Sequence, residues 1–405
     1  METTLSFSQK FSLHRAVPFL LVTTLFLLPM SSSGKSIGMA LSVVAILLSP
    51  SYRSELAGLF AKPWCKAALI LFGIALLACF WSPANFSERF FVVEKYSKLL
   101  YLPLLVVGFR DAKTRKTGLH AFLCAIFITC ALSILKFHGF LQSLAIDPDN
   151  VFRNHIITGF MVAFATYLSL LLAHRHQGLR GRIAYVLLAG IYSYQELFIN
   201  IGRTGYVVYL LMMGILVLQL CSWRQAIAGI LLISSAFTLA YFKYPLINEH
   251  VNSIAKELNR YQNNDKNSAV GYRLQFHDFA HKLFNQHPVF GNGTGSFTYY
   301  FRTEKPVPAW GPKLLEPHNQ YWLVAAEFGI VGFAALLFLF VSLIRASWQL
   351  NTTRAIAFAM LIPFLLGNLS DSLLFYSGSG YFFLLFMALC LGERVRPEKE
   401  LGNTL

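Results

Sequence analysis

The sequence predicts an all-α polytopic integral membrane protein with about twelve transmembrane helices and one large outward-facing loop between spans nine and ten. Hydrophobic residues make up 56% of the 405 residues and charged residues only 13%, about half the charged share of soluble domains. A soluble domain of this length could not bury so much apolar surface, whereas a bilayer accepts it. The apolar runs and the placement of the basic residues between them support the same fold class.

The apolar runs have nearly the length of a membrane span. They cover residues 16–30, 36–50, 67–82, 96–109, 118–134, 157–173, 183–199, 205–220, 226–241, 319–344, 355–369 and 378–391. The runs are continuously apolar and do not alternate, which favours helices over barrel strands. Run 16–30 lacks a following small-residue cleavage site and a second run comes at once, so we expect a first span and no signal peptide.

The formal net charge of +15 does not indicate nucleic-acid binding, because the basic residues form short clusters between apolar runs instead of one stripe. When the sides of the membrane are alternated, one set of short loops carries most of the Lys and Arg, for example residues 110–116 and 175–182. The positive-inside rule therefore predicts that both termini are cytoplasmic and that residues 242–318 face outward. The six cysteines lie in or beside apolar runs without a CxxC pair, which predicts neither disulfides nor a cysteine metal site.

This topology divides the chain into four parts. Residues 1–241 hold the first nine spans, 242–318 the outward loop, 319–391 the last three spans, and 392–405 a cytoplasmic tail. Within the loop, apolar residues recur at near-helical spacing from Tyr272 to Phe284 and predict an amphipathic helix. Polar residues 263–268 before this helix predict irregular structure. Residues 288–295 after it predict turns, followed by an aromatic cluster at 297–301.

Two arginines are candidates for binding an anion. Arg203 lies in Asn200-Ile201-Gly202-Arg203-Thr204-Gly205, between two spans with almost no loop, and the flanking glycines would let a bulky ligand approach. Arg273 lies in the first turn of the predicted loop helix, where a cation opposes the helix dipole unless an anion is bound as well. A membrane-interface anchor and a solvated surface arginine are the alternative interpretations.

The point where the loop re-enters the membrane carries His318, within Glu316-Pro317-His318-Asn319-Gln320-Tyr321-Trp322. A neutral imidazole there could accept a proton near pH 7, although a lone interfacial histidine is more often structural. Further polar residues lie at the bilayer edge, where such groups tend to line a cavity. They are Glu94, Lys95, Lys98, Arg153, His155 and Asp371.

Two other patterns are rejected as sites. The glycine-rich segment 291–295 has no preceding strand and no following Gly-Lys-Ser/Thr, so it predicts a turn and not a nucleotide-binding loop. His277 and His281 share a helix face at zinc-site spacing, but no convincing third ligand accompanies them. We therefore expect no metal.

The order and spacing of several motifs resemble the superfamily of O-antigen ligases and O-antigen polymerases. The motifs are Gly202-Arg203-Thr204-Gly205, Gly271-Tyr272-Arg273, His287-Pro288-Val289-Phe290-Gly291 followed by Gly293, His318-Asn319, and Glu327 with Gly329 and Gly332. The resemblance implies a glycosyltransferase of the bacterial inner membrane, with its active site facing the periplasm. It implies that O-antigen moves from undecaprenyl pyrophosphate to a sugar hydroxyl of lipid A-core in lipopolysaccharide biosynthesis, without ATP, metal or another cofactor.

The resemblance also assigns roles by position. His318 matches the catalytic histidine, and Arg203 and Arg273 match the essential arginines that would bind pyrophosphate. Lys98 and Asp371 fall near polar positions of the superfamily, and with Arg153 and His155 they are possible substrate-binding residues. No carboxylate nucleophile stands beside the arginines, so we expect a single displacement with inversion. An O-antigen polymerase, a protein O-oligosaccharyltransferase and, from another class, a lipid-linked glycan flippase remain alternatives; the sequence shows neither clear repeats nor broken helices, which transporters often have.

Overall fold

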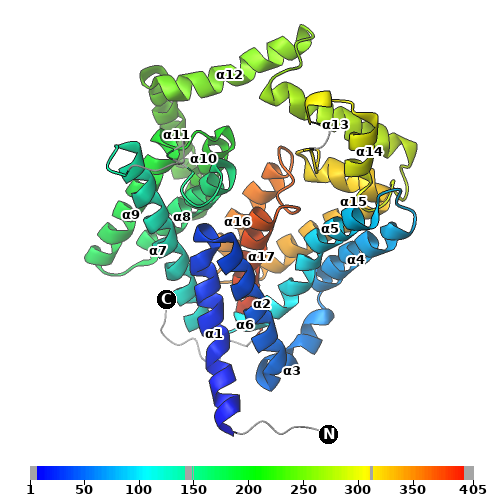
Figure 1. Ribbon diagram of the computed structural model, residues 1–405. Coiled ribbons are helices and arrows are strands. Elements are labelled where there is room, and N and C mark those ends of the chain that lie inside the picture. The colour runs from blue at the N-terminus through cyan, green and yellow to red at the C-terminus, as the bar shows by residue number, and fades with distance from the viewer. Residues whose placement is uncertain (1–6, 142–147, 149, 311–312, 396–405) are drawn as a thin grey trace.

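The computed structural model describes residues 7–141, 148, 150–310 and 313–395, and within these the regular structure is entirely helical (Figure 1). The α-helices are, in chain order, α1 (Phe7–Met30), α2 (Ser32–Leu48), α3 (Pro50–Phe60), α4 (Pro63–Leu77), α5 (Phe86–Ser97), α6 (Tyr101–Gly108), α7 (Ala112–Phe137), α8 (His155–Arg175), α9 (Leu179–Phe198), α10 (Arg203–Leu220), α11 (Trp223–Lys243), α12 (Pro245–Gln262), α13 (Ala269–Gln286), α14 (Ser296–Glu304), α15 (Gln320–Trp348), α16 (Arg354–Gly367) and α17 (Ser377–Leu391). Short 3-10 helices are η1 (Ala78–Phe80), η2 (Lys98–Leu100), η3 (Pro308–Trp310) and η4 (Gly392–Arg394).

Every predicted apolar run coincides with helical structure, with ends shifted by a few residues. Run 96–109 is the least regular, because it is divided between the end of α5, η2 and α6. The described parts of the chain contain six helices that are long and apolar enough to cross a membrane, or seven if the bent pair α2 and α3 forms one span. The all-helical fold is therefore confirmed, but the count of twelve spans is not.

Two of the apolar helices are interrupted. The axes of α2 and α3 differ by 94°, and α15 contains a break at Gly329, whose φ of 63° and ψ of −160° lie outside the helical region. The turn after α13 fills this break, since the N–H groups of Ile330 and Val331 donate to the carbonyl oxygens of Pro288 and Val289 at 2.8 and 3.3 Å. The sequence did not show these interruptions clearly.

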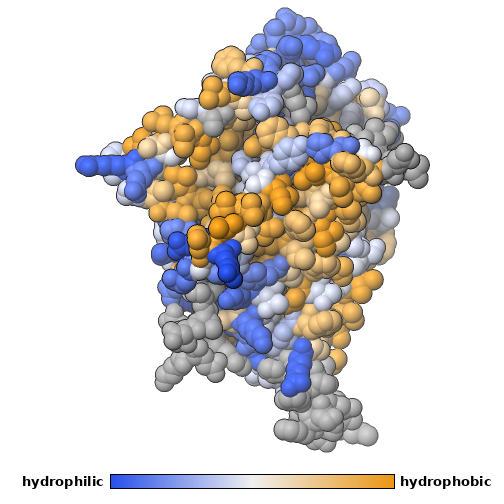
Figure 2. Space-filling view, turned by 90° about the vertical axis from the view of Figure 1, so that its left-hand side faces the viewer, coloured by the Kyte–Doolittle hydropathy of each residue, from blue (hydrophilic) through white to orange (hydrophobic). Residues whose placement is uncertain are grey.

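The surface has an apolar belt. Figure 2 shows orange, hydrophobic residues across the middle of one face and blue, hydrophilic residues at the upper tip. Helices α9 and α11 contribute large exposed apolar side chains. Among them are Ile183, Val186, Leu187, Leu231, Leu232 and Leu239. In water such a patch would be costly, whereas against lipid chains it is favourable.

The loop predicted at residues 242–318 is folded and mostly helical. Helix α13 confirms the helix predicted from Tyr272 to Phe284, and residues 263–268 and 288–295 are irregular or turns, as expected. Helix α12 is not foreseen by the sequence analysis. It runs across the top of the molecule in Figure 1, from the end of α11 to α13.

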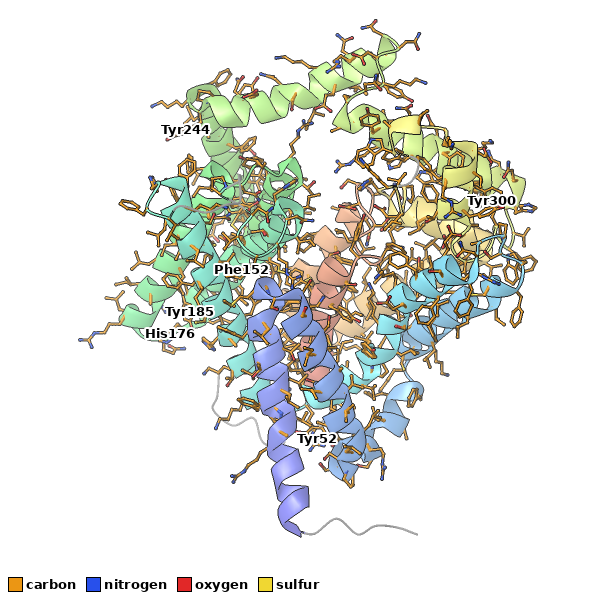
Figure 3. The ribbon with its side chains drawn as sticks, in the orientation of Figure 1. Tyr52, Phe152, His176, Tyr185, Tyr244 and Tyr300 are labelled. Atoms are coloured by element: carbon orange, nitrogen blue, oxygen red, sulfur yellow. The ribbon has the colours of Figure 1, made fainter. Side chains whose placement is uncertain are left out.

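Two of the loops predicted to be cytoplasmic lie away from the long loop predicted to face outward. Figure 3 places Tyr52 and His176, which flank predicted cytoplasmic loops, in the lower half, and Tyr244 and Tyr300, in the predicted outward loop, in the upper half. The alternation is therefore consistent with the arrangement of the helices, while the compartment at each end stays a prediction.

Candidate functional site

His318 stands directly before α15, at the point where the chain turns from the loop into this helix. Its φ of +53° lies in the left-handed region, which is uncommon for a residue with a side chain. The next residue, Asn319, caps α15 by accepting hydrogen bonds from the N–H groups of Tyr321 and Trp322, both at 3.0 Å. Because strained backbone persists only where the surroundings enforce it, the orientation of His318 is a built feature of the fold.

Two carboxylates hold one nitrogen of the His318 ring. Nδ1 lies 3.2 Å from Oε1 of Glu316 and 3.3 Å from Oδ1 of Asp371. The backbone N–H of His318 also donates to Oε2 of Glu316 at 2.6 Å. Among the described residues, Nε2 has no hydrogen-bond partner, and the side chain is 22% exposed. The carboxylates therefore favour the tautomer with the proton on Nδ1, which leaves Nε2 free to accept another.

The carboxylates are themselves anchored. The Tyr376 hydroxyl donates to Oε1 of Glu316 at 2.7 Å, and the N–H of Ser372 donates to Oδ1 of Asp371 at 2.9 Å. The buried ammonium of Lys98 donates to the carbonyl oxygens of Leu374, Phe375 and Tyr376 at 2.7, 2.8 and 3.1 Å. Lys98 thus fixes residues 374–376, just after Asp371, which favours a structural role for it over substrate binding.

The electrostatic balance raises the pKa of His318. Burial alone would lower it, but the hydrogen bond with Asp371 and the negative charges of Glu316 and Asp371 outweigh burial, while the charge of Arg273 lowers it. Burial raises the pKa of Glu316, with a further contribution from Asp371 and an opposing one from His318. The cluster therefore makes the imidazole a stronger base than one in water.

Helix α13 brings Arg273 to the same region. Nε2 of His277 lies 3.3 Å from the carbonyl oxygen of His318, and the ring of Phe276 stacks on the His318 ring with centroids 6.0 Å apart. The charge of Arg273 lowers the pKa of both His277 and His318. Arg273 forms no hydrogen bond or ion pair within the described parts of the chain.

Arg203 begins α10 and is paired. Its Nη2 donates to Oε1 of Glu257 in α12 at 2.5 Å, and Oε2 of Glu257 accepts from the N–H of Val270, in the first turn of α13, at 2.9 Å. No hydrogen bond or ion pair within the described ranges joins Arg203 directly to Arg273 or His318. The structure therefore links the start of α10 to the start of α13 through one carboxylate. The expectation that no carboxylate stands beside the arginines is wrong for Arg203.

The turn before Arg203 is built on buried polar groups. Asn200 donates to both carboxylate oxygens of Glu196 at 3.1 Å, and its Oδ1 accepts from the N–H of Gly202 at 2.9 Å. A Cβ on Gly205 would lie 2.2 Å from Oε1 of Glu196, so this glycine makes room for Glu196. The expectation that both flanking glycines make room for a ligand is therefore wrong for Gly205.

The remaining candidates lie apart from one another. His155, at the start of α8, approaches the Gly202 turn, since its Cδ2 would be 3.1 Å from a Cβ at that position. Arg153 donates to Ser32 and, at 2.9 Å, to the carbonyl oxygen of Leu28, which ties it to the junction of α1 and α2. Glu94 and Lys95 pair with each other at 3.7 Å. Of the possible substrate-binding residues, Asp371 contacts His318 and His155 lies beside the Arg203 turn.

The carboxylate–histidine cluster also has the composition of a metal site. One ligand atom from each of Glu316, His318 and Asp371 lies within 4.8 Å of the others, and within the described ranges this is the one such group. His277 and His281 are not part of this group. The expectation of no metal stays a prediction, because the cluster offers three ligands of the types that Zn²⁺ accepts.

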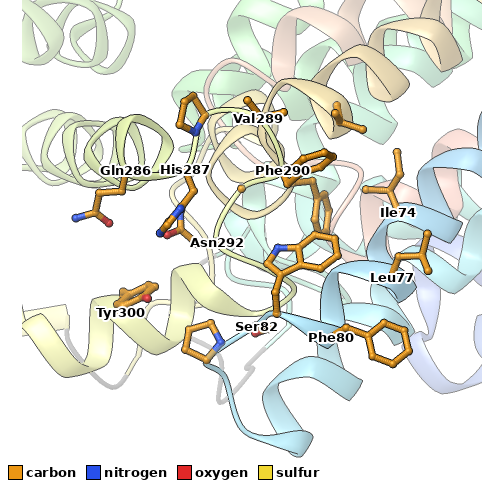
Figure 4. Close-up of a pocket in the computed structure, with 16 residues that line it drawn as sticks. Ile74, Leu77, Phe80, Ser82, Gln286, His287, Val289, Phe290, Asn292 and Tyr300 are labelled. Carbon is orange, nitrogen blue, oxygen red and sulfur yellow. The ribbon is translucent and has the colours of Figure 1, made fainter.

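A separate cavity of about 1020 Å³ opens between η1, the turn after α13, and α15 (Figure 4). Its apolar walls include Ile74, Leu77, Phe80, Val289, Phe290, Phe328 and Val331. Gln286 and His287 lie at its polar side. His318, Arg203 and Arg273 do not line it, so this cavity is distinct from the carboxylate–histidine cluster.

Sequence reasoning assigned no role to Glu316, Tyr376 or Glu257. Glu316 stands two residues before His318 in a motif that was noticed, so its proximity was a usable signal. Tyr376 and Glu257 approach their partners only through the tertiary fold, across 60 and 54 residues.

A comparison with proteins of curated function gives no match. The family model described as O-antigen ligase matches residues 188–337, from the middle of α9 to the middle of α15. This segment contains Arg203, Glu257, Arg273, Glu316 and His318 but not Asp371. Over this segment, the chain is similar to the O-antigen ligase family.

Proposed function

We propose that the chain is an O-antigen ligase, which transfers a glycan from undecaprenyl pyrophosphate to a sugar hydroxyl of lipid A-core on the periplasmic side of the inner membrane. The observation that carries the proposal is the His318 ring, with Nδ1 held by two carboxylates and Nε2 unpartnered among the described residues. Arg273 lies on α13, the helix whose Phe276 and His277 contact His318. This is the arrangement of a base beside a binding site for an anionic leaving group.

The reaction is a single displacement. The acceptor hydroxyl oxygen attacks the anomeric carbon, the bond from this carbon to the pyrophosphate oxygen breaks, and the hydroxyl proton moves to Nε2 of His318. The resulting imidazolium is stabilised by Glu316 and Asp371, in the way that the aspartate of a catalytic triad stabilises its histidine. Undecaprenyl pyrophosphate leaves, and the anomeric centre is inverted because one displacement occurs.

The arginines supply the electrostatic part of the reaction. Negative charge grows on the pyrophosphate as the glycosidic bond breaks, and guanidinium groups bind phosphate through charge-assisted hydrogen bonds. Arg273 has no competing ion pair among the described residues. When its charge is neutralised by the donor, it no longer lowers the pKa of His318, so donor binding strengthens the base that the acceptor needs. The donor already carries the pyrophosphate as an activated leaving group, so the transfer needs no ATP.

The broken helix α15 favours one candidate of another class, a lipid-linked glycan flippase, since transporters use interrupted helices at their binding sites. In this chain, however, the turn 288–289 satisfies the N–H groups of Ile330 and Val331 at the break. A break that is filled by the protein itself offers no backbone groups to a substrate there, which favours the enzyme.

The test is reconstitution of the purified full chain in proteoliposomes with undecaprenyl-pyrophosphate-linked glycan and lipid A-core, without ATP. We expect the glycan on lipid A-core, detected by its shift on a gel. A lipid-linked repeat as the preferred acceptor would instead identify a polymerase, and a peptide acceptor would identify a protein O-oligosaccharyltransferase. Translocation without transfer would identify the flippase and overturn the proposal.

A further inference from the structure

The ion pair between Arg203 and Glu257 joins the start of α10 to α12. Both oxygens of Glu257 are used: Oε1 accepts from Nη2 of Arg203 at 2.5 Å, and Oε2 accepts from the N–H of Val270 at 2.9 Å. A guanidinium and the N–H groups of a helix start are the groups with which proteins bind phosphate. The carboxylate of Glu257 therefore takes the place that an anion would take between Arg203 and the N–H of Val270.

The surroundings keep this carboxylate charged. Burial would raise the pKa of Glu257, but the hydrogen bonds from Arg203 and Val270 and the nearby charges outweigh burial and lower it. The side chain of Glu257 is 12% exposed and that of Arg203 33% exposed, so the pair is reachable from solvent. An exchangeable anion has these properties.

Helix α12 carries Glu257 and lies across the outward end of the molecule in Figure 1. Hydrogen bonds also join α12 to α11 and α13. Asn252 accepts from the Tyr241 hydroxyl of α11 at 2.9 Å, and the Tyr261 hydroxyl donates to Asp278 of α13 at 3.1 Å. The apolar side chains of Val251, Ile254 and Leu258 are exposed along it. Breaking the pair with Arg203 therefore leaves α12 attached to α11 and α13 while it separates from the start of α10.

We propose that Glu257 is an internal competitor that determines which anions reach Arg203: it occupies the phosphate position in the empty protein, and the diphosphate of the donor displaces it. This inference rests on the proposed function, because it names the group that the donor must replace. A single-charged phospholipid headgroup competes poorly with a carboxylate held by two donors, whereas a diphosphate carries more charge and more acceptor oxygens. Glu257 thus keeps the phosphates of the surrounding bilayer away from the site.

The experiment measures binding of inorganic pyrophosphate and of inorganic phosphate to the full chain in phosphatidylcholine nanodiscs by calorimetry. Glu257→Gln keeps the shape but removes the competing charge. We expect both anions to bind about tenfold more tightly or more, the effect of removing a charge-assisted hydrogen bond to the site. Glu249→Gln, on an exposed residue of the same helix, is the matched control and should change affinity by less than about twofold. Unchanged affinity in Glu257→Gln overturns the inference.

A second measurement needs no variant. Displacement of Glu257 separates α12 from α10, so pyrophosphate should increase trypsin cleavage at the exposed Lys256 and Lys266 of the wild-type chain. Cleavage that stays constant while pyrophosphate binds overturns the inference. Neither measurement involves a glycan. Tighter anion binding in Glu257→Gln without any glycan transfer would therefore overturn only the proposed function, and transfer with unchanged anion binding would overturn only the role of Glu257.

Discussion

The surroundings of His318 and of Arg203 are built differently, although both lie in the segment that matches the family. His318 is held by Glu316, Asp371 and a strained backbone, and its carboxylate partners are anchored in turn by Tyr376 and the segment that Lys98 fixes. Arg203 is held by one carboxylate from a helix at the edge of the molecule. The first arrangement is preorganised, and the second is exchangeable.

This difference corresponds to two requirements of the proposed reaction. A base must keep its direction through every turnover, because misplacement by about 1 Å costs on the order of 10² in rate. A site for a large lipid-linked anion must open and close around it. A fold that holds the His318 imidazole rigidly and lets the ion pair of Arg203 exchange meets both requirements.

The largest effect is expected from His318→Ala. Removing the base should lower glycan transfer by about 10² to 10⁴, the usual contribution of general base catalysis. The rate is measured in the proteoliposome assay, with thermal unfolding as the test of folding. His281→Ala, on the exposed side of α13, is the control and should retain transfer. A folded His318→Ala variant with wild-type turnover would contradict the assignment of the base.

A somewhat smaller loss is expected from Arg273→Gln. Deleting a group that stabilises charge in the transition state costs about 10² to 10³ in kcat. Arg302→Gln is the control, because Arg302 is an exposed arginine in the same loop as Arg273 and is paired with Glu88 of α5. Arg203→Gln should lower transfer less than Arg273→Gln, since part of the binding energy of Arg203 is already used against Glu257. Equal losses of transfer in both variants would contradict the difference between Arg203, which is paired with Glu257, and Arg273, which has no ion pair among the described residues.

Asp371→Asn should cost about 10- to 100-fold, as is typical when a residue that orients a reacting group is replaced. The informative readout is the pH profile. His318 acts in its neutral form, and its pKa is raised, so transfer by the wild type should fall as pH drops through a value above the ordinary histidine range. Asp371→Asn removes a raising influence and should move this acid limb to lower pH. A limb that stays in place would indicate a purely structural Asp371.

The sequence predicted the helices well because span-length apolar runs carry a strong local signal. It predicted α13 from the spacing of Leu274, Phe276 and Phe279, and it named His318, Arg203 and Arg273 from short motifs. The break at Gly329 was not predicted, although Glu327, Gly329 and Gly332 interrupt the apolar run at this place. Helix α12 was missed because its polar face makes it resemble a loop.

The partners of the candidate residues were harder to predict, because they depend on contacts between distant segments. Asp371 was named as a bilayer-edge residue, yet its position 3.3 Å from His318 follows from the packing of residues 53 positions apart. Lys98 was expected in a cavity, and the fold instead uses it to bind three carbonyls. A single sequence indicates which polar residues cost free energy to bury, but not which groups in the fold become their hydrogen-bond or ion-pair partners.

The smallest effect is expected from removing metal. Glu316, His318 and Asp371 have the composition of a three-ligand site, but a metal there would bind Nδ1 of His318 and prevent it from donating to the carboxylates. If the imidazole is the base, dialysis against EDTA should leave transfer unchanged, and added Zn²⁺ should inhibit by occupying the cluster. Loss of transfer with EDTA and recovery with Zn²⁺ would instead make the rigid region a metal centre. The free Nε2 of His318 would then have no role as the base.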